Sequence, residues 1–303
     1  MAKQEHLSLL RQGVCVWNQY KKENFEEPTD LTDANLMGEN LRDGYFQSSN
    51  LSRANLSQAN LRQANLSRAN LYQATLEETS LCGACLNQAF LSEAVLFQSD
   101  ISQANLIGAC LDGTDLQKAK LMHANLTAAS LKAAIFWQSN LAVAILRRAN
   151  LTQATIQETS FWRADLRETD IIQVYFNQVN LNEANLCGAN LMSSLIKRTS
   201  FWKTNLEGAF LKEAYLKAIV FYQTNLTGVS FQEANLQGAI FKDVNLTGAN
   251  FTGASLERAV FIRANLRRTN LTGASFKRTI FQKANFEAIQ GFDSNNQSGT
   301  LIY

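Results

Sequence analysis

The sequence predicts a solenoid, a fold in which the chain winds repeatedly around one central axis. From Leu31 to Phe286, every fifth residue is Leu, Ile or Phe, at 52 consecutive positions without exception. A small residue, usually Ala, stands two positions before nearly all of them, and the residue directly before is most often Asn. Glu39, in the first coil, is the oddest occupant of the small position. Self-similarity at a fixed short period is the signature of a repeat architecture. Such regularity tells against an enzyme, because it leaves little room for a specialised site.

A period of five residues fits neither a helix nor a strand. A step of five rotates a helix by roughly 140°, which scatters the large residues around its axis. In a strand, the same step sends successive residues to opposite faces. All of the large residues can be buried only if the chain turns about a central axis and each five-residue unit forms one wall. The small residue is then the second inward side chain, since the large one already fills the interior.

The repeating unit resembles that of the pentapeptide repeat family, whose units read Ala-Asn/Asp-Leu followed by two variable residues. Good matches are residues 59–63 (Ala-Asn-Leu-Arg-Gln), 184–188 (Ala-Asn-Leu-Cys-Gly) and 249–253 (Ala-Asn-Phe-Thr-Gly). The resemblance covers about five sixths of the chain, as an uninterrupted array of the kind common in cyanobacteria. It implies an all-β solenoid, namely a right-handed quadrilateral β-helix of about 13 coils with four pentapeptides in each.

The spacing of the phenylalanines supports a coil of four pentapeptides. Five phenylalanines recur at intervals of 20 in the C-terminal half, and a β-branched residue stands directly before four of the five. Coils of this length would stack each series as a ladder on one wall. The five phenylalanines are Phe201, Phe221, Phe241, Phe261 and Phe281.

Residues 1–28 precede the repeats and follow a different pattern. Leu7, Leu10, Val14 and Trp17 fall on one face of an amphipathic helix. A solenoid exposes apolar core and unpaired backbone at its ends. We therefore expect a short N-terminal α-helical cap over the first coil, and similar arrays carry such a leader.

The array is expected to occupy residues 29–290, followed by a C-terminal tail at 291–303. The tail contains a polar stretch, residues 293–299, that is typical of a flexible loop. Phe292 and residues 301–303 are candidates to cover the last coil. The sequence leaves open whether this end is capped, frayed or paired with a second copy. The expected state is a monomer or a C-terminal-end dimer.

The composition predicts a cytoplasmic protein without a strong charge preference. Lys and Arg number 28 against 26 Asp and Glu, which gives a net charge of +2 and does not favour nucleic acid as a partner. No apolar run reaches about 18 residues, and the first residues lack the apolar core of a signal peptide, so no membrane segment is predicted. Five scattered cysteines, an odd number, fit free thiols in a reducing compartment.

Apolar residues at outward positions predict one candidate interaction surface. Most outward residues are polar, but apolar ones recur once in every four pentapeptides on two neighbouring walls in the C-terminal half. Exposed patches of this kind often mark a protein-binding site, with Trp and Tyr as anchors. The alternative is that aromatic and β-branched residues simply favour stacked strands. On one wall the residues are Tyr175, Leu195 and Tyr215. On the other wall, Val220, Ile240, Val260 and Ile280 directly precede the inward residue, and Trp162, Trp202, Tyr222 and Ile262 directly follow it.

No constellation in the sequence favours catalysis, a cofactor or a metal. Cys82 and Cys85 have the spacing of a redox motif, but both occupy outward positions of ordinary repeats, and we interpret them as incidental thiols. His6 and His123 are the only histidines, one in the leader and one in the array. Neither a two-histidine metal site nor a Ser-His-Asp triad is therefore expected. The sequence predicts no catalytic, cofactor-binding or metal-binding residue.

Basic residues gather near the C-terminus, with few acidic residues between them. A stripe of this kind can meet nucleic acid or an acidic protein. Small polar residues interrupt it and aromatic residues are sparse, so a solvated face is favoured. The basic residues are Arg258, Arg263, Arg267, Arg268, Lys277, Arg278 and Lys283.

Two functions are consistent with these patterns. The favoured one is a non-enzymatic rigid scaffold, or protein–protein interaction module, that binds another protein through the apolar and aromatic outer face. The resemblance implies the alternative, a DNA-mimicking inhibitor of topoisomerase (gyrase), which is the best-known activity among similar proteins. Such proteins carry a strongly acidic surface, and the quinolone-resistance members have loops between repeats. The net charge of +2 and an array without loops disfavour this alternative.

Overall fold

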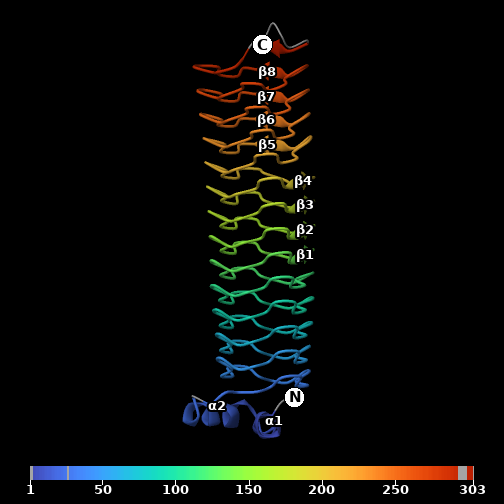
Figure 1. The fold of residues 1–303 in the computed structure, drawn as a ribbon, viewed down its shortest axis with the longest axis vertical. Coiled ribbons are helices and arrows are strands. Elements are labelled where there is room, and N and C mark those ends of the chain that lie inside the picture. The colour runs from blue at the N-terminus through green and yellow to red at the C-terminus, as the bar shows by residue number, and fades with distance from the viewer. Residues whose placement is uncertain (1–2, 26, 293–298, 303) are drawn as a thin grey trace. The chain divides into compact units, whose positions relative to one another are not determined.

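Parallel stacked coils make up most of the structure, a computed structural model that describes residues 3–25, 27–292 and 299–302. The chain divides into two compact units, residues 1–150 and 151–303, and each contains coils of the same kind. Two short helices precede the coils of the first unit (Figure 1). The fold is the β-solenoid that the sequence predicts.

Each pentapeptide turns the chain through one corner of a coil. The carbonyl of Leu56 accepts a hydrogen bond from the backbone N–H of Ala59 at 3.0 Å, which closes a turn over the two residues between them. The second of these, Gln58, has a φ of 60° in the left-handed region. At the start of the turn, Asn55 Oδ1 accepts a hydrogen bond from the backbone N–H of Ser57 at 3.0 Å. This bond explains why Asn so often precedes the large inward residue.

Successive coils pair in parallel between residues 20 positions apart. Asn55 lies opposite Thr75, and Thr75 lies opposite Val95. The backbone N–H of Leu56 donates to the carbonyl of Thr75 at 2.7 Å. The predicted coil of four pentapeptides is therefore confirmed. A side chain's neighbour along the stack is the residue 20 positions before or after it.

The pairing extends into three-residue strands at positions where the first residue is usually β-branched, a type that favours strands. Strands β5 to β8 stack one above another (Figure 1). The first unit contains β1 (Ile135–Trp137), and the second contains β2 (Thr155–Gln157), β3 (Tyr175–Asn177), β4 (Leu195–Lys197), β5 (Val220–Tyr222), β6 (Ile240–Lys242), β7 (Val260–Ile262) and β8 (Ile280–Gln282).

The large inward residues form the core, and the predicted phenylalanine ladder lies in the second unit. Centroids of successive rings are 5.2, 5.1, 4.6 and 4.9 Å apart from Phe201 to Phe281. Thr replaces Ala at some of the small inward positions. At one of them, Thr204 Oγ1 donates a hydrogen bond to the backbone carbonyl of Leu181 at 2.8 Å. The buried polar atom is therefore satisfied inside an apolar interior.

The leader forms two helices rather than the single helix expected from its apolar face. The helices are α1 (Gln4–Arg11) and α2 (Val14–Glu23). Gly13 separates them with a φ of 109°, a conformation that residues with a side chain rarely adopt. Leu10 and Trp17, two members of the expected apolar face, are buried.

Trp17 fastens α2 to the first coil. Its ring stacks on Phe46 with 5.6 Å between centroids, and its Nε1 donates to the carbonyl of Tyr45 at 2.9 Å. Asn18 Nδ2 donates to the carbonyl of Asp43 at 2.9 Å, and Asn18 Oδ1 accepts from the backbone N–H of Tyr45 at 2.8 Å. The leader thus covers apolar surface and pairs backbone groups at the start of the array.

Ionisable side chains also take part in this cap. The backbone N–H of Asp30 donates to His6 Nδ1 at 3.1 Å, and the His6 side chain is buried. Burial lowers the pKa of Lys21, whose Nζ donates to Thr29 Oγ1 at 2.8 Å. Burial also raises the pKa of Tyr20 to about 12. One of the two histidines therefore serves the structure of the leader.

The described C-terminal residues cover the last coil. The Phe292 ring stacks on Phe276 with 5.0 Å between centroids and meets Phe281 edge-on at 5.6 Å. Strand β9 (Leu301–Ile302) pairs in parallel with β8. Tyr303 and residues 293–298, which hold most of the expected loop, lie outside the described residues. The C-terminal-end dimer stays a prediction.

The second residue of each turn has a positive φ, so a β-branched side chain placed there is expected to destabilise the protein through backbone strain. Gly208 has a φ of 63°, and nothing lies within 4 Å of a Cβ added there. We expect Gly208→Val to lower the free energy of unfolding by about 1–2 kcal/mol, because a β-branched residue is strained in this region. Urea unfolding measures the loss. Gly208→Asn is the control and should stay within about 0.5 kcal/mol of wild type, since Asn tolerates a positive φ. Equal losses in both variants would contradict a backbone cause.

Candidate functional site

All eleven residues of the predicted interaction surface lie in the second unit, and none of them is buried. Two of the predicted columns are continuous along the stack. In the first, Tyr175 lies opposite Leu195, and Leu195 lies opposite Tyr215. The second runs along the first residues of β5 to β8, in the order Val220, Ile240, Val260 and Ile280.

The third column is interrupted at two coils. In the register of the stacked coils, Asn182 lies between Trp162 and Trp202. Lys242 likewise separates Tyr222 from Ile262. Trp202 and Tyr222 are consequently the only predicted residues of this column that are direct neighbours. The common phase of all four residues predicts a single column, and the structure interrupts it.

Trp202 and Tyr222 line a hollow of about 410 Å³. The other lining residues are Arg198, Thr199, Ser200, Ala218, Ile219 and Val220. The Trp202 side chain is 36% exposed, Val220 is 46% exposed and Tyr222 is half-buried. Trp202 Nε1 donates to Gln223 Oε1 at 3.3 Å. The hollow therefore presents two aromatic rings and an aliphatic side chain to solvent, with one cation beside them.

Cationic side chains lie over both aromatic rings. Lys203 Nζ is 4.6 Å from the centroid of the Trp202 ring, and Lys242 Nζ is 5.0 Å from that of Tyr222. Cation–π attraction favours this arrangement and holds the rings in place. These contacts are not among the sequence predictions. The signal was present, because Lys203 directly follows Trp202 and Lys242 stands four pentapeptides after Tyr222.

Trp162 belongs to a separate polar cluster. The Arg163 guanidinium lies 4.3 Å from the Trp162 ring centroid, and Arg163 Nε pairs with Glu183 Oε2 at 2.8 Å. The hydrogen bond from Arg163 holds the pKa of the Glu183 carboxyl below its ordinary value. The arrangement ties Trp162 to charged neighbours rather than to the hollow around Trp202.

Five of the seven basic residues near the C-terminus fall into two groups. Arg263 Nε pairs with Asp243 Oδ1 at 2.6 Å, and Arg267 Nη2 pairs with Glu287 Oε1 at 2.9 Å. The hydrogen bond from Arg263 lowers the pKa of Asp243. Both pairs join residues 20 positions apart and are exposed, as expected of a solvated face. A groove unites the other group, which contains Arg258, Lys277 and Arg278.

A second aromatic hollow, of about 500 Å³, lies in the first unit and has Tyr72, Phe90 and Arg68 among its lining residues. The Phe90 side chain is 56% exposed, and the Tyr72 hydroxyl donates to Glu93 Oε2 at 3.2 Å. This hollow is not among the sequence predictions. Tyr72 and Phe90 are 18 positions apart, so no recurrence at 20 marks them.

The residues considered for other chemistry are not assembled into a site. Cys82 and Cys85 are free thiols, as are the other three cysteines, and His123 is exposed. Among the described residues, no three His, Cys, Asp or Glu side chains lie close enough to hold a metal ion. No helix in the described part of the chain is long and apolar enough to cross a membrane.

The stacked coils and their outward side chains define the class of the protein, a β-solenoid scaffold. Two profiles of pentapeptide repeats match well over half of its sequence. The chain belongs to the pentapeptide repeat family. The profile "Pentapeptide repeats (8 copies)" matches residues 40–77, 49–88, 76–117, 99–138, 144–182 and 170–201, and the profile "Pentapeptide repeat region" matches residues 194–271.

Several solved structures of pentapeptide repeat proteins are similar to this chain. HetL from the cyanobacterium Nostoc sp. strain PCC 7120, involved in heterocyst differentiation regulation, is 32% identical over 71% of this chain and 87% of its own, with a TM-score of 0.32. Rfr23 from the cyanobacterium Cyanothece 51142 is 21% identical over 46% of this chain and 84% of its own, with a TM-score of 0.17. QnrB1, a plasmid-mediated fluoroquinolone resistance protein, is 16% identical over 74% and 91%, with a TM-score of 0.25. No curated protein matches the chain.

Proposed function

We propose that this pentapeptide repeat scaffold is a non-enzymatic, cytoplasmic interaction module that binds another protein through the surface around Trp202 and Tyr222. The observation that carries the proposal is the hollow in which these two rings lie beside Val220. Trp, Tyr and Arg most often anchor protein interfaces, and the hollow contains one of each, with Arg198 as the third. The apolar column from Val220 to Ile280 extends the surface beyond the hollow.

The fixed geometry of the two rings supports tight binding. Lys203 and Lys242 lie over the rings of Trp202 and Tyr222, and the cation–π attraction favours one position of each ring before a partner arrives. Ordering a free side chain at an interface costs about 0.5–1.5 kcal/mol, so rings that are already ordered lose less on binding. The backbone register also fixes the spacing of the two rings along the stack.

The remaining features favour this function over the alternatives. Free thiols at all five cysteines fit a reducing compartment. The strict repeat, which gives nearly every inward position to packing, supports a role without catalysis. A mimic of DNA needs a strongly acidic surface, whereas Arg198, Lys203 and Lys242 surround the aromatic rings here and the net charge is +2.

Removal of both aromatic anchors is expected to release the partner. We expect Trp202→Ala with Tyr222→Ala to weaken the affinity at least about 30-fold, because truncation of an interface anchor typically costs about 2 kcal/mol or more. The partner is first captured from an extract of the native cell on immobilised wild-type protein. Its affinity for each purified variant is then measured by titration calorimetry.

The matched control removes two aromatic side chains from the other hollow. Tyr72→Ala with Phe90→Ala should leave the affinity within about twofold of wild type, as truncations outside an interface do. An affinity that falls in this control and persists in the Trp202/Tyr222 variant would assign binding to the first unit and refute the proposed surface.

A further inference from the structure

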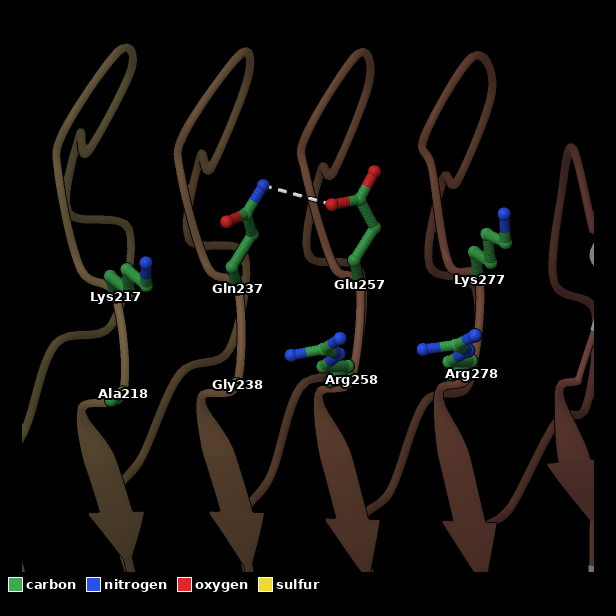
Figure 2. A pocket seen from close by; sticks show the side chains of 8 residues that line it. All are labelled: Lys217, Ala218, Gln237, Gly238, Glu257, Arg258, Lys277 and Arg278. Carbon is green, nitrogen blue, oxygen red and sulfur yellow. Dashed lines mark hydrogen bonds between the residues drawn. The ribbon is translucent and has the colours of Figure 1, made fainter.

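A groove of about 450 Å³ runs along the corner that directly precedes strands β5 to β8 (Figure 2). Four successive coils each contribute two neighbouring residues to it. The groove adjoins the hollow around Trp202, because Ala218 lines both of them. A ligand bound in the hollow can therefore continue into the groove.

Four cations line this groove, and a single acidic residue, Glu257, lies among them. The Glu257 carboxylate is already engaged, since Oε2 accepts from Gln237 Nε2 at 2.9 Å and Oε1 accepts from Ser275 Oγ at 3.0 Å. Figure 2 shows the Gln237–Glu257 pair on one side of the row and the two arginine side chains on the other. The four cations are Lys217, Arg258, Lys277 and Arg278.

Arg258 and Arg278 occupy the same position of the pentapeptide in adjacent coils. Some arginines at this position of the pentapeptide pair with an acid at the same position of an adjacent coil, as Arg163 does with Glu183 at 2.8 Å. Arg53–Asp33 and Arg263–Asp243 repeat the arrangement at 2.7 and 2.6 Å. Others do not: Arg68 donates to Gln88 Oε1 at 3.0 Å, and neither Arg198 nor Arg268 has an acid 20 positions away.

Arg258 and Arg278 both lack such an acid. The residue 20 positions before Arg258 is Gly238, and the residue 20 positions after it is Arg278. Neither arginine forms an ion pair with a residue in the described part of the chain. Like charges on adjacent strands are destabilising, and an anion between them removes the repulsion.

The lining also leaves room for a ligand beside the arginines. Nothing lies within 4 Å of a Cβ added at Gly238, and Ala218 carries only a methyl group. The guanidinium groups of Arg258 and Arg278 in Figure 2 extend along the row toward these small residues. The open space therefore lies beside two arginines that form no ion pair with any described residue.

We propose that this groove binds the carboxylates of an acidic segment of the protein that docks on the hollow. The inference rests on the proposed function, whose surface it extends and whose partner it specifies by charge. A guanidinium group donates two parallel hydrogen bonds to a carboxylate, so Arg258 and Arg278 each bind one Asp or Glu side chain. Lys217 and Lys277 add charge beside them. The groove itself contains no aromatic ring on which a nucleic-acid base could stack, so its own lining favours carboxylates over the bases of a single-stranded nucleic acid.

Fluorescence anisotropy with labelled deca-glutamate tests the groove directly on the full chain. We expect binding to wild type, and at least a tenfold weaker affinity in Arg258→Gln with Arg278→Gln, because each substitution removes charge-assisted hydrogen bonds. Arg62→Gln with Lys132→Gln removes the same charge from two exposed positions of the first unit and should change the affinity less than about twofold. Absent binding, or equal weakening in both variants, would overturn the proposal. Decathymidylate is the second probe, and tighter binding with the same dependence on the two arginines would reassign the groove to phosphate.

Titrations of the captured partner separate this inference from the proposed function. If the affinity requires Trp202 and Tyr222 but is unchanged in the Arg258/Arg278 variant, the acidic segment is refuted and the proposed surface stands. If the affinity also falls at least about tenfold in the Arg258/Arg278 variant, as with deca-glutamate, the proposed surface and the acidic segment both stand. If it is independent of Trp202 and Tyr222 while deca-glutamate still needs the arginines, the proposed surface fails and the carboxylate groove remains.

Discussion

Phe241→Ala is expected to lower the free energy of unfolding by about 3–5 kcal/mol, the range found when a buried phenylalanine is truncated. The Phe241 ring is fully buried. It stacks between Phe221 and Phe261, at 5.1 and 4.6 Å between centroids, and meets Phe231 and Phe251 edge-on. Neighbouring rings cannot close the gap, because the backbone register holds each coil at a fixed spacing. The cost therefore includes a cavity as well as the lost transfer energy.

Urea unfolding followed by far-ultraviolet circular dichroism measures this loss. Because repeat arrays can unfold in parts, hydrogen exchange of the amides in β5 to β7 is recorded alongside it. The control is Phe210→Ala, which removes an outward phenylalanine that is 51% exposed and should change the stability by less than about 0.5 kcal/mol. Similar losses in both variants would contradict the inward and outward assignment of the two rings.

Trp17→Ala is expected to detach the leader and open the first coil. The Trp17 ring is fully buried, stacks on Phe46 and donates a hydrogen bond to the carbonyl of Tyr45. Truncation of a buried tryptophan costs about 3–5 kcal/mol, and here the loss falls on the end of a stack in which each coil is stabilised by its neighbours. The expected result is rapid hydrogen exchange at the amides of residues 31–50, while protection in the second unit stays at its wild-type level.

Val16→Ala is the control for this variant. Val16 precedes Trp17 in α2, but its side chain is 38% exposed, so its truncation should leave exchange in residues 31–50 within about twofold of wild type. Full protection of residues 31–50 in Trp17→Ala would show that the coil is stable without the leader, and the capping role of Trp17 would be wrong.

The period of five determines most of the fold because every pentapeptide adopts the same backbone turn and points the same positions inward. The large residue must point inward, and the coil of four pentapeptides follows from the phase of Phe201 and Phe221. The break between the two leader helices could not be predicted in this way. The apolar face continues through Gly13, and a single glycine inside a helical pattern is tolerated. Only the backbone conformation of Gly13 reveals the break.

The columns of the candidate surface could be predicted because phase modulo 20 decides which outward side chains are neighbours. Phase also places Asn182 between Trp162 and Trp202. Phase alone could not show that Trp202 and Tyr222 line a hollow, or that Arg163 ties Trp162 to Glu183, because both depend on side-chain geometry. The groove around Arg258 and Arg278 could likewise be predicted only in part from the sequence. The stacking of Arg258 and Arg278 follows from phase, but the engagement of Glu257 by Gln237 and Ser275 requires side-chain geometry.

Site-specific photo-crosslinking tests the central claim, that a partner binds the wall around Trp202 and Tyr222, most directly. The photoreactive residue p-benzoylphenylalanine replaces Tyr222 in one variant and Phe210, an exposed outward aromatic two walls earlier in the chain, in the other. Irradiation with the captured partner should give a covalent adduct with the variant at position 222 and none with the variant at position 210. An adduct at position 210 without one at position 222 would contradict the proposed surface.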